Sequence, residues 1–332
     1  MTLHSIAFLG YGNVGRALAA LLAARRDALR ERYGVEYRVA GVATRRGGWI
    51  AAPDGLDPAA PAGQRCASVD EWLARARPDV VFETTVLDPH AGQPALDYLR
   101  AVLAAGAHAV SANKGPVVHG YAELSRLAAA AGRRYLFESA VADGAPVFSL
   151  VRRCLPLAGL RAVSGVFTST ATVVLEAVEE GLGVAEGIAR AQAMGVAEAD
   201  PGYDVDGWDS AVKLCAIATV LLGVPLAPGE VAREGIRALD ADAVREAKRA
   251  GRPYRLVGRV VRAGRGGRVE ARVAPERLSP EDPLGAARGT TLVMHYEADV
   301  FPGGLTVTSG APDLATTAYG MLTDFLEAVG AT

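Results

Sequence analysis

The sequence contains little cysteine. Cys66, Cys154 and Cys215 are widely separated among 332 residues and form no Cys-x-x-Cys pair. Zinc sites and disulfide frameworks need cysteines at paired spacings or in even sets. We therefore expect neither, and a reducing compartment, the cytoplasm, is the simplest setting for the chain.

Long apolar runs are also lacking. A run such as 216–222 is far shorter than the roughly 20 residues needed to cross a bilayer. The chain enters the apolar stretch at 6–9 without a preceding basic region, unlike a signal peptide. We expect no membrane span, and we interpret 6–9 as part of a buried strand.

An excess of charge of one sign is absent as well. The chain has 35 Lys and Arg against 37 Asp and Glu, with a formal net charge of −2. Such a balance gives no positive field with which to hold a polyanion. Nucleic acid is therefore not an expected partner.

The sequence does have enough apolar residues and length for two domains, since half of its residues are hydrophobic. Up to about residue 145, apolar runs alternate with Ala-, Leu- and Arg-rich stretches, which predicts βαβ units and a parallel sheet. The expected strands are 5–9, 38–43, 79–82, 107–111 and 134–138, and the expected helices are 13–32, 69–76, 93–105 and 121–131. Between them, the Gly/Pro/Ala-rich stretch 47–64 is predicted to be a surface loop.

The pattern changes after about residue 145. Strands are expected around 160–168, 255–262, 268–274 and 291–300, with helices at 171–180, 184–194, 207–222 and 229–234. We predict an α/β fold with a nucleotide-binding domain at 1–145 and a mixed α/β domain at 146–307. The last segment, 308–332, is expected to carry a helix that returns to pack on the first domain.

A glycine-rich loop follows the first predicted strand and opens the first predicted helix. Its residues are Gly10, Tyr11, Gly12, Asn13, Val14 and Gly15. In this pattern the first glycine permits a tight turn, the second lets the backbone approach a pyrophosphate, and the third lets helix and strand pack closely. The helix N-terminus offers N–H groups to the phosphates, so the doubly wound parallel sheet is predicted to be a Rossmann fold.

The end of the second predicted strand carries Arg45 and Arg46 where NAD sites usually place a carboxylate. Arginine pairs with a 2′-phosphate through charge-assisted hydrogen bonds. We therefore favour NADP as the cofactor, with NAD as the alternative. The two arginines as ordinary solvated loop residues remain an open interpretation.

Two lysines stand in unusual surroundings. Lys114 follows a predicted strand, at the carboxyl edge where such sheets bind ligands. Lys213 lies four residues after Asp209, so a helix places both on one face as an ion pair. Five carboxylates precede Lys213 within 198–209, but their spacing is not that of a calcium loop. A surface ion pair is the plain alternative to a catalytic role, although the apolar residues that follow favour a buried helix facing a cleft.

The segments 10–15, 111–117, 138–146 and 198–213 together resemble homoserine dehydrogenase, over nearly the whole chain and in a short form without the amino-acid-sensing domain of many relatives. The resemblance implies NAD(P)-dependent interconversion of L-homoserine and L-aspartate 4-semialdehyde, in threonine and methionine biosynthesis, by a homodimer that pairs through its second domain. Lys213 would transfer the proton, Lys114 would flank the reacting oxygen, and Asp209 would act beside them. A lysine that transfers protons near neutral pH needs a lowered pKa.

The resemblance assigns further residues to binding roles. Glu198, Asp204 and Thr170 would contact the substrate, and Thr84, Ser111, Asn113 and Lys114 would join the glycine loop and Arg45 and Arg46 at the cofactor. A monovalent cation would be held by Glu138, Val141, Asp143 and Ala145, although Asp143 is unusual at a position where the family tends to have a small residue. Thr168, Ala171, Thr172 and Val196 also depart from the family pattern near the substrate, which leaves the substrate side chain open.

Three alternatives remain at this stage. A related dehydrogenase could act on another small hydroxy amino acid, and a nucleotide-binding redox sensor would need no turnover. Aspartate-semialdehyde dehydrogenase would need a thiolate nucleophile, for which Cys154 is the candidate, but its apolar flanks suggest a structural thiol.

Overall fold

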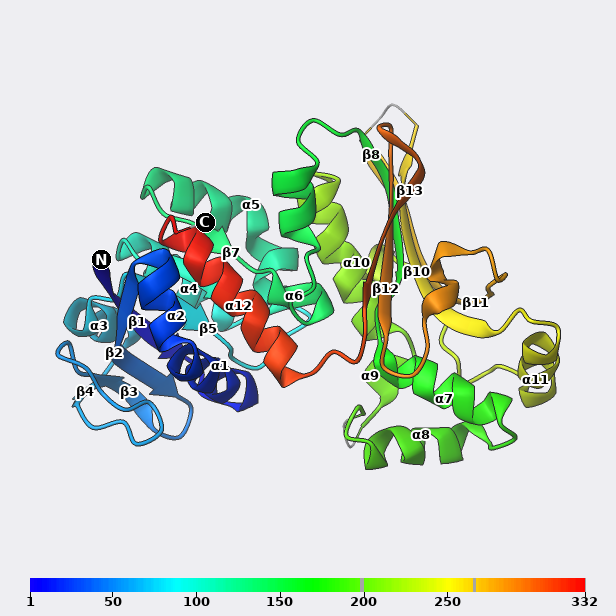
Figure 1. The fold of residues 1–332 in the computed structure, drawn as a ribbon, viewed down its shortest axis with the longest axis horizontal. Coiled ribbons are helices and arrows are strands. Elements are labelled where there is room, and N and C mark those ends of the chain that lie inside the picture. The colour runs from blue at the N-terminus through cyan, green and yellow to red at the C-terminus, as the bar shows by residue number, and fades with distance from the viewer. Residues whose placement is uncertain (198–199, 265–266, 332) are drawn as a thin grey trace. The chain divides into compact units, whose positions relative to one another are not determined.

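The computed structural model describes residues 1–197, 200–264 and 267–331. The chain separates into two compact units, one formed by Met1–Val147 with Asp313–Thr332 and the other by Phe148–Pro312 (Figure 1). In the described part of the chain, no helix has the length and apolar character needed to cross a bilayer.

The first unit is built on a seven-stranded sheet with the order β4-β3-β2-β1-β5-β6-β7. Five strands run parallel: β1 (Thr2–Leu9), β2 (Val35–Thr44), β5 (Val80–Glu83), β6 (His108–Ser111) and β7 (Tyr135–Leu136). The strands β3 (Gly48–Ala51) and β4 (Gln64–Cys66) extend it as an antiparallel edge. The predicted parallel Rossmann sheet is confirmed, and the carboxyl ends of β1, β2, β5 and β6 share one edge.

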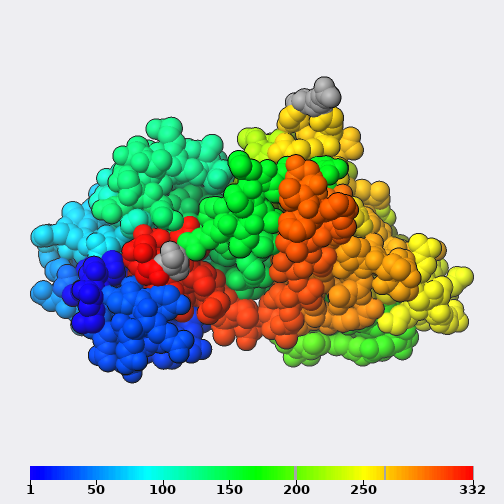
Figure 2. Space-filling view, turned by 45° about the horizontal axis from the view of Figure 1, so that its top comes forward, coloured from blue at the N-terminus to red at the C-terminus, as the bar shows by residue number. Residues whose placement is uncertain are grey.

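Helices pack on this sheet. They are α1 (Asn13–Ala24), α2 (Arg26–Tyr33), α3 (Val69–Ala76), α4 (Ala95–Ala104), α5 (Lys114–Ala130), α6 (Ser139–Ala142) and α12 (Leu314–Ala328). The C-terminal helix α12 packs beside α1, where Figure 2 shows the red end of the chain against blue residues. Its Phe325 ring lies 5.8 Å from that of Phe82, in the same buried cluster as Phe8.

The prediction of a loop throughout 47–64 is wrong at β3. Trp49 of this strand contacts the rings of Trp72 and Tyr98, and the Trp72 indole donates to the Ile50 carbonyl at 2.9 Å. Pairing with β2 and aromatic packing thus override a composition that predicts a loop. The single helix predicted at 13–32 is also divided, because α1 ends at Ala24 and α2 begins at Arg26.

The second unit contains a six-stranded, largely antiparallel sheet with the order β13-β12-β8-β10-β11-β9. Its strands are β8 (Leu160–Val166), β9 (Ala232–Arg233), β10 (Tyr254–Ala263), β11 (Arg268–Arg277), β12 (Leu292–Ala298) and β13 (Phe301–Ser309). Its helices are α7 (Ser169–Glu179), α8 (Val184–Ala193), α9 (Gly202–Val205), α10 (Trp208–Leu221) and α11 (Ala241–Arg249), with short turns at Leu150–Cys154, Pro228–Glu230 and Pro283–Ala286. Both α7 and α10 pack against β10.

The helix predicted at 229–234 is wrong. A single 3-10 turn covers Pro228–Glu230, and β9 then pairs in parallel with β11. A proline at the start of the turn and strand pairing directly after it leave no room for an α-helix. The sequence reasoning also missed α11, which buries only Val244 and Ala247, and the edge strand β13, which is largely exposed.

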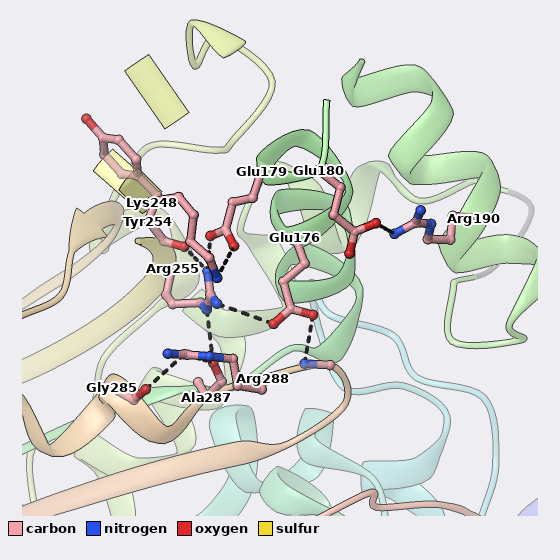
Figure 3. Close-up of polar contacts among 11 residues, drawn as sticks. Glu176, Glu179, Glu180, Arg190, Lys248, Tyr254, Arg255, Gly285, Ala287 and Arg288 are labelled. Carbon is pink, nitrogen blue, oxygen red and sulfur yellow. Dashed lines mark hydrogen bonds and ion pairs between the residues drawn. The ribbon is translucent and has the colours of Figure 1, made fainter. Parts of the chain in front are cut away.

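A buried arginine joins several elements of the second unit (Figure 3). Arg255 of β10 has no solvent exposure, and it donates to Glu179 Oε1 at 2.7 Å and to the Ala287 carbonyl at 3.0 Å. It also reaches Glu176 at 3.3 Å, and Lys248 of α11 pairs with Glu179 at 2.9 Å. Because a buried charge must be paired, this cluster fixes α7, β10 and α11 together.

Candidate active site

The glycine loop makes a tight turn at the end of β1. Gly10 has φ +92°, in the left-handed region, and a Cβ there would lie 2.6 Å from the Thr84 carbonyl oxygen. A Cβ on Gly15 would lie 2.9 Å from the carbonyl oxygen of Gly10. Only glycine fits either position without a backbone shift, so the loop packs as the motif predicts.

The N-terminus of α1 is open at Gly12. This residue caps the helix without a side-chain hydrogen bond, and a Cβ on it would meet nothing within 4 Å. Asn13 and Val14 begin the helix, so their N–H groups belong to the first turn, which has no intrahelical acceptor. This geometry fits a bound phosphate.

A cavity of about 910 Å³ lies beside this turn, within the first unit. The predicted cofactor residues that line it are Gly10, Gly12, Arg45, Arg46 and Thr84. Sequence reasoning missed several others in its wall, including Tyr11, Trp49, Thr85, Asp88, Gln93 and Tyr98. The Thr44 hydroxyl accepts from the Gly47 N–H at 2.8 Å and so fixes the turn that carries both arginines.

A buried carboxyl stands behind this wall and was also missed. Glu83 ends β5, and its side chain bonds to the Ser111 hydroxyl at 2.5 Å and to the Thr85 N–H at 2.7 Å. Burial raises the pKa of the Glu83 carboxyl, while these hydrogen bonds oppose the shift. No sequence signal marks it, because Ser111 lies 28 residues further along the chain.

The lysine loop 111–114 lies at the end of β6. The Ser111 hydroxyl accepts from the Asn113 N–H, and the Asn113 side chain caps α5 by accepting from Gly115 N, each at 3.0 Å. Lys114 is the first residue of α5 and is half-buried. Neither Ser111 nor Asn113 lines the cavity; their side chains hold the loop in shape.

In the second unit, α10 places Asp209 and Lys213 as predicted. Gly207, with φ +80°, caps the helix in the left-handed region, and Asp209 lies in its first turn. The Lys213 Nζ lies 2.8 Å from Asp209 Oδ2, with side-chain exposures of 12% and 9%, and donates to the Phe167 carbonyl at 2.7 Å. The pair is therefore largely buried, unlike an ordinary ion pair on a helix surface, which was the alternative to a catalytic role.

Further predicted substrate residues lie in the same unit. The Thr170 hydroxyl bonds to Asp204 Oδ2 at 2.8 Å and to the Val196 carbonyl at 2.7 Å. Nearby, the Tyr203 hydroxyl is buried without a hydrogen-bond partner in the described part of the chain, and burial together with Asp209 and Asp204 raises the pKa of Tyr203. Glu198 lies outside the described residues.

The predicted cation residues surround α6 in the first unit. Glu138 is buried and its Oε1 accepts from the Val147 N–H at 2.5 Å. Asp143 follows α6 in the left-handed region, and its Oδ1 accepts from Thr317 Oγ1 at 3.3 Å. Val141 is buried in α6, and the Ala145 N–H donates to the Ala142 carbonyl at 2.9 Å. The cation site stays a prediction.

In comparisons with known proteins, both units match models of the same enzyme family. Residues 10–138 match the family model "Homoserine dehydrogenase, NAD binding domain", and residues 146–326 match "Homoserine dehydrogenase". The chain belongs to the homoserine dehydrogenase family. The predicted recognition, the NAD(P)-dependent oxidoreductase class and the place in amino-acid biosynthesis are therefore confirmed.

Relatives and solved structures agree over the full length. An NAD(+)-dependent homoserine dehydrogenase of Pseudomonas canavaninivorans is 32% identical, with coverage of 98% of this chain and 96% of the relative. The crystal structure of a putative homoserine dehydrogenase from Archaeoglobus fulgidus has a TM-score of 0.85 at 30% identity, covering 98% of both chains. A hyperthermophilic archaeal homoserine dehydrogenase in complex with NADPH has a TM-score of 0.83 at 25% identity, covering 100% of this chain and 99% of the other.

The family membership leaves the roles of single residues to be tested. The structure groups the glycine loop, both arginines and Thr84 around one cavity of the first unit. It also brings Lys213 next to Asp209, and Thr170 next to Asp204, in the second. That Lys114 and Lys213 flank one reacting oxygen stays a prediction.

Proposed function

We propose that this chain interconverts L-homoserine and L-aspartate 4-semialdehyde with Lys213 as the proton-transfer residue. The observation that carries the assignment is the buried Lys213–Asp209 pair at 2.8 Å. A surface pair of this spacing would contribute only a few tenths of a kcal/mol. Burying two charges costs more than that pairing returns, so a functional reason for the pair is favoured.

Lys213 and its neighbours provide the chemistry expected at the substrate oxygen. An ammonium held by Asp209 and by the Phe167 carbonyl is fixed in position, and its charge stabilises an alkoxide that develops on the substrate. In the direction of homoserine oxidation the neutral amine of Lys213 would take the hydroxyl proton and become that ammonium, and in the reverse direction the ammonium would return the proton. Asp204 and Thr170 would bind the polar groups of the substrate, together with Glu198.

The first unit is proposed to hold the nicotinamide cofactor. Gly10, Gly12 and the first turn of α1, at Asn13 and Val14, fit a pyrophosphate, because the turn is open there and its N–H groups have no intrahelical acceptor. When bound, the nicotinamide supplies the hydride chemistry. Lys114 would add positive charge at the carboxyl edge of the sheet.

We propose a preference for NADP. Arg45 and Arg46 are exposed and line the cavity, with no carboxylate at the end of β2, so a 2′-phosphate would meet two guanidinium groups. The solved archaeal relative in complex with NADPH is in line with this preference, whereas NAD is the alternative because another relative is an NAD(+)-dependent enzyme.

We further propose a cytoplasmic homodimer. The edge strand β13 is largely exposed, and Figure 2 shows it on the visible face. An open edge of this kind can pair with a second copy, and sedimentation of the purified protein would test this.

A monovalent cation bound at Glu138, Val141, Asp143 and Ala145 would appear as activation by potassium or sodium ions.

The decisive experiment is steady-state oxidation of L-homoserine with NADP⁺ and NAD⁺ supplied separately. Lys213→Met should lower kcat by about a thousandfold, because both proton transfer and charge stabilisation are lost. Lys248→Met is the matched control, since it also breaks a lysine–carboxylate pair in the second unit, with Glu179, but should retain activity. Absence of turnover despite nucleotide binding, or equal kcat for Lys213→Met and the unmodified chain, would reject the assignment.

A further inference from the structure

Glu83 is buried at the junction of two loops that serve the cofactor side of the first unit. It ends β5, an inner strand of the sheet, and has no solvent exposure. Its Oε1 accepts from the Thr85 N–H at 2.7 Å, from the Thr85 hydroxyl at 2.5 Å and from Asn113 Nδ2 at 3.5 Å. Its Oε2 bonds to the Ser111 hydroxyl at 2.5 Å. One carboxyl thus holds the turn after β5 and the turn after β6.

The first of these turns forms part of the cavity wall. Thr84 and Thr85 both line the cavity. The Thr84 hydroxyl donates to the Gly10 carbonyl at 3.0 Å, and its N–H donates to the Leu9 carbonyl at 2.8 Å. Glu83 therefore lies one hydrogen bond behind the surface that the cofactor would touch, and the turn it holds also supports the glycine loop.

The second turn sets the start of α5. Ser111 accepts from Asn113 N, and the Asn113 side chain caps the helix whose first residue is Lys114. Removing the Glu83 carboxyl would leave the Ser111 hydroxyl and the Asn113 amide without their buried acceptor. Buried polar groups seek new partners when one is lost, so the Lys114 backbone would shift.

We propose that Glu83 is a positioning residue that couples the cofactor-binding turn at Thr84 and Thr85 to the lysine loop at Ser111–Lys114. All the groups that bond to it in the described part of the chain are neutral donors. A carboxyl in such a place acts as a shared acceptor, not as half of an ion pair. Burial, which raises the pKa of this carboxyl, is consistent with that role.

The proposal rests on the proposed function only for its kinetic readout, because nucleotide affinity can be measured without turnover. Glu83→Leu should weaken NADPH binding, followed by the fluorescence of the bound nucleotide, by about tenfold or more, as for the loss of a buried hydrogen bond. Glu83→Gln should retain most of the affinity, because its carbonyl still accepts from Thr85 and its amide can donate to the Ser111 hydroxyl. The KM for the nucleotide should rise more than the KM for homoserine.

Tyr135→Phe is the matched control. The Tyr135 hydroxyl is buried near Glu83 but makes no hydrogen bond in the described part of the chain. Its loss should leave nucleotide affinity unchanged. Affinity in folded Glu83→Leu equal to that of the unmodified chain, or an equal loss in Tyr135→Phe, would overturn the proposal.

A double-mutant cycle covers the case in which Glu83→Leu does not fold. Thr85→Val and Ser111→Ala each remove one hydroxyl, and these hydroxyls contact different oxygens of Glu83. Coupling through the carboxyl predicts that the effects on nucleotide affinity are not additive. Additive effects would show that the two loops act independently, against the proposal. An absence of homoserine turnover with intact coupling would reject the assigned reaction alone.

Discussion

Lysine is rare in this chain, and its placement is informative. Only Lys114, Lys213 and Lys248 are present among the 35 basic side chains. Arginine does not lose its proton in proteins, whereas a lysine amine can. Two of the three lysines lie in the motifs assigned to the reaction, which is what a need for proton transfer would produce in an arginine-rich chain.

The two arginines after β2 give a test of cofactor choice. Replacing Arg45 and Arg46 with alanine should raise the KM for NADP⁺ by about ten- to hundredfold, because the charge-assisted contacts to a 2′-phosphate are lost. The KM for NAD⁺ should change little. Steady-state kinetics with each nucleotide measures the ratio. Equal effects on both nucleotides would mean that the arginines are solvated loop residues.

Among single residues, those with contacts that are local in sequence could be predicted, whereas those with contacts that are distant in sequence could not. The tight turn at Gly10 and Gly15 and the pairing of Asp209 with Lys213 could be predicted, because both depend on spacing within one loop or one helix. Glu83 is different, since its partners Ser111 and Asn113 come from the end of the neighbouring strand β6 and the loop after it. Trp49 and Tyr98 were missed in the same way, because the edge hairpin and α4 bring them together only in the folded sheet.

At the scale of elements, the strongly periodic ones were predicted and the irregular ones were not. The parallel strands and α7, α8 and α10 follow from apolar runs. The strand β3 depends on pairing with β2, and β9 depends on pairing with β11. Such short strands gain their stability from partners that are distant in sequence, so local composition cannot indicate them.

The Arg255 cluster predicts a large effect on the stability of the second unit. Arg255→Met should lower the free energy of unfolding by about 3 kcal/mol, because Glu179 stays buried without its main cation. Arg190→Met is the control: its pair with Glu180 joins α7 and α8 at 2.6 Å but is exposed (Figure 3), so about 0.5 kcal/mol is expected. Denaturant unfolding measures both, and similar losses would contradict the account of Arg255.

At the scale of the whole molecule, acid stability is linked to a histidine in the first sheet. His108 Nδ1 accepts from the Arg134 N–H at 3.1 Å, which requires the neutral ring. Burial, helped by the Arg133 and Arg134 guanidinium groups and His4 and opposed by Asp79, lowers the pKa of His108 to about 4. In the unfolded chain the ordinary value is 6.5. The unfolded state therefore binds the proton first.

The stabilising contribution of neutral His108 is present above pH 6.5 and is lost as the pH falls towards 4. We expect the free energy of unfolding to decrease by about 2 kcal/mol over this window from His108 alone. His108→Asn, which keeps an acceptor but cannot titrate, should flatten the decrease. His90→Asn, at an exposed histidine, should leave the decrease unchanged. The free energy of unfolding, measured at several pH values, tests this prediction. An equal dependence on pH in the unmodified chain, His108→Asn and His90→Asn would contradict it.

The helix α12 has a consequence for the order in which the protein can form as it leaves the ribosome. Residues 1–147 emerge first, but the cluster around Phe8 and Phe82 also contains Phe325 and Met321 of α12. The whole second unit is translated before that helix exists. Until α12 has been made, the first unit lacks the residues that cover part of its apolar cluster, and exposed apolar surface of this kind favours aggregation during synthesis.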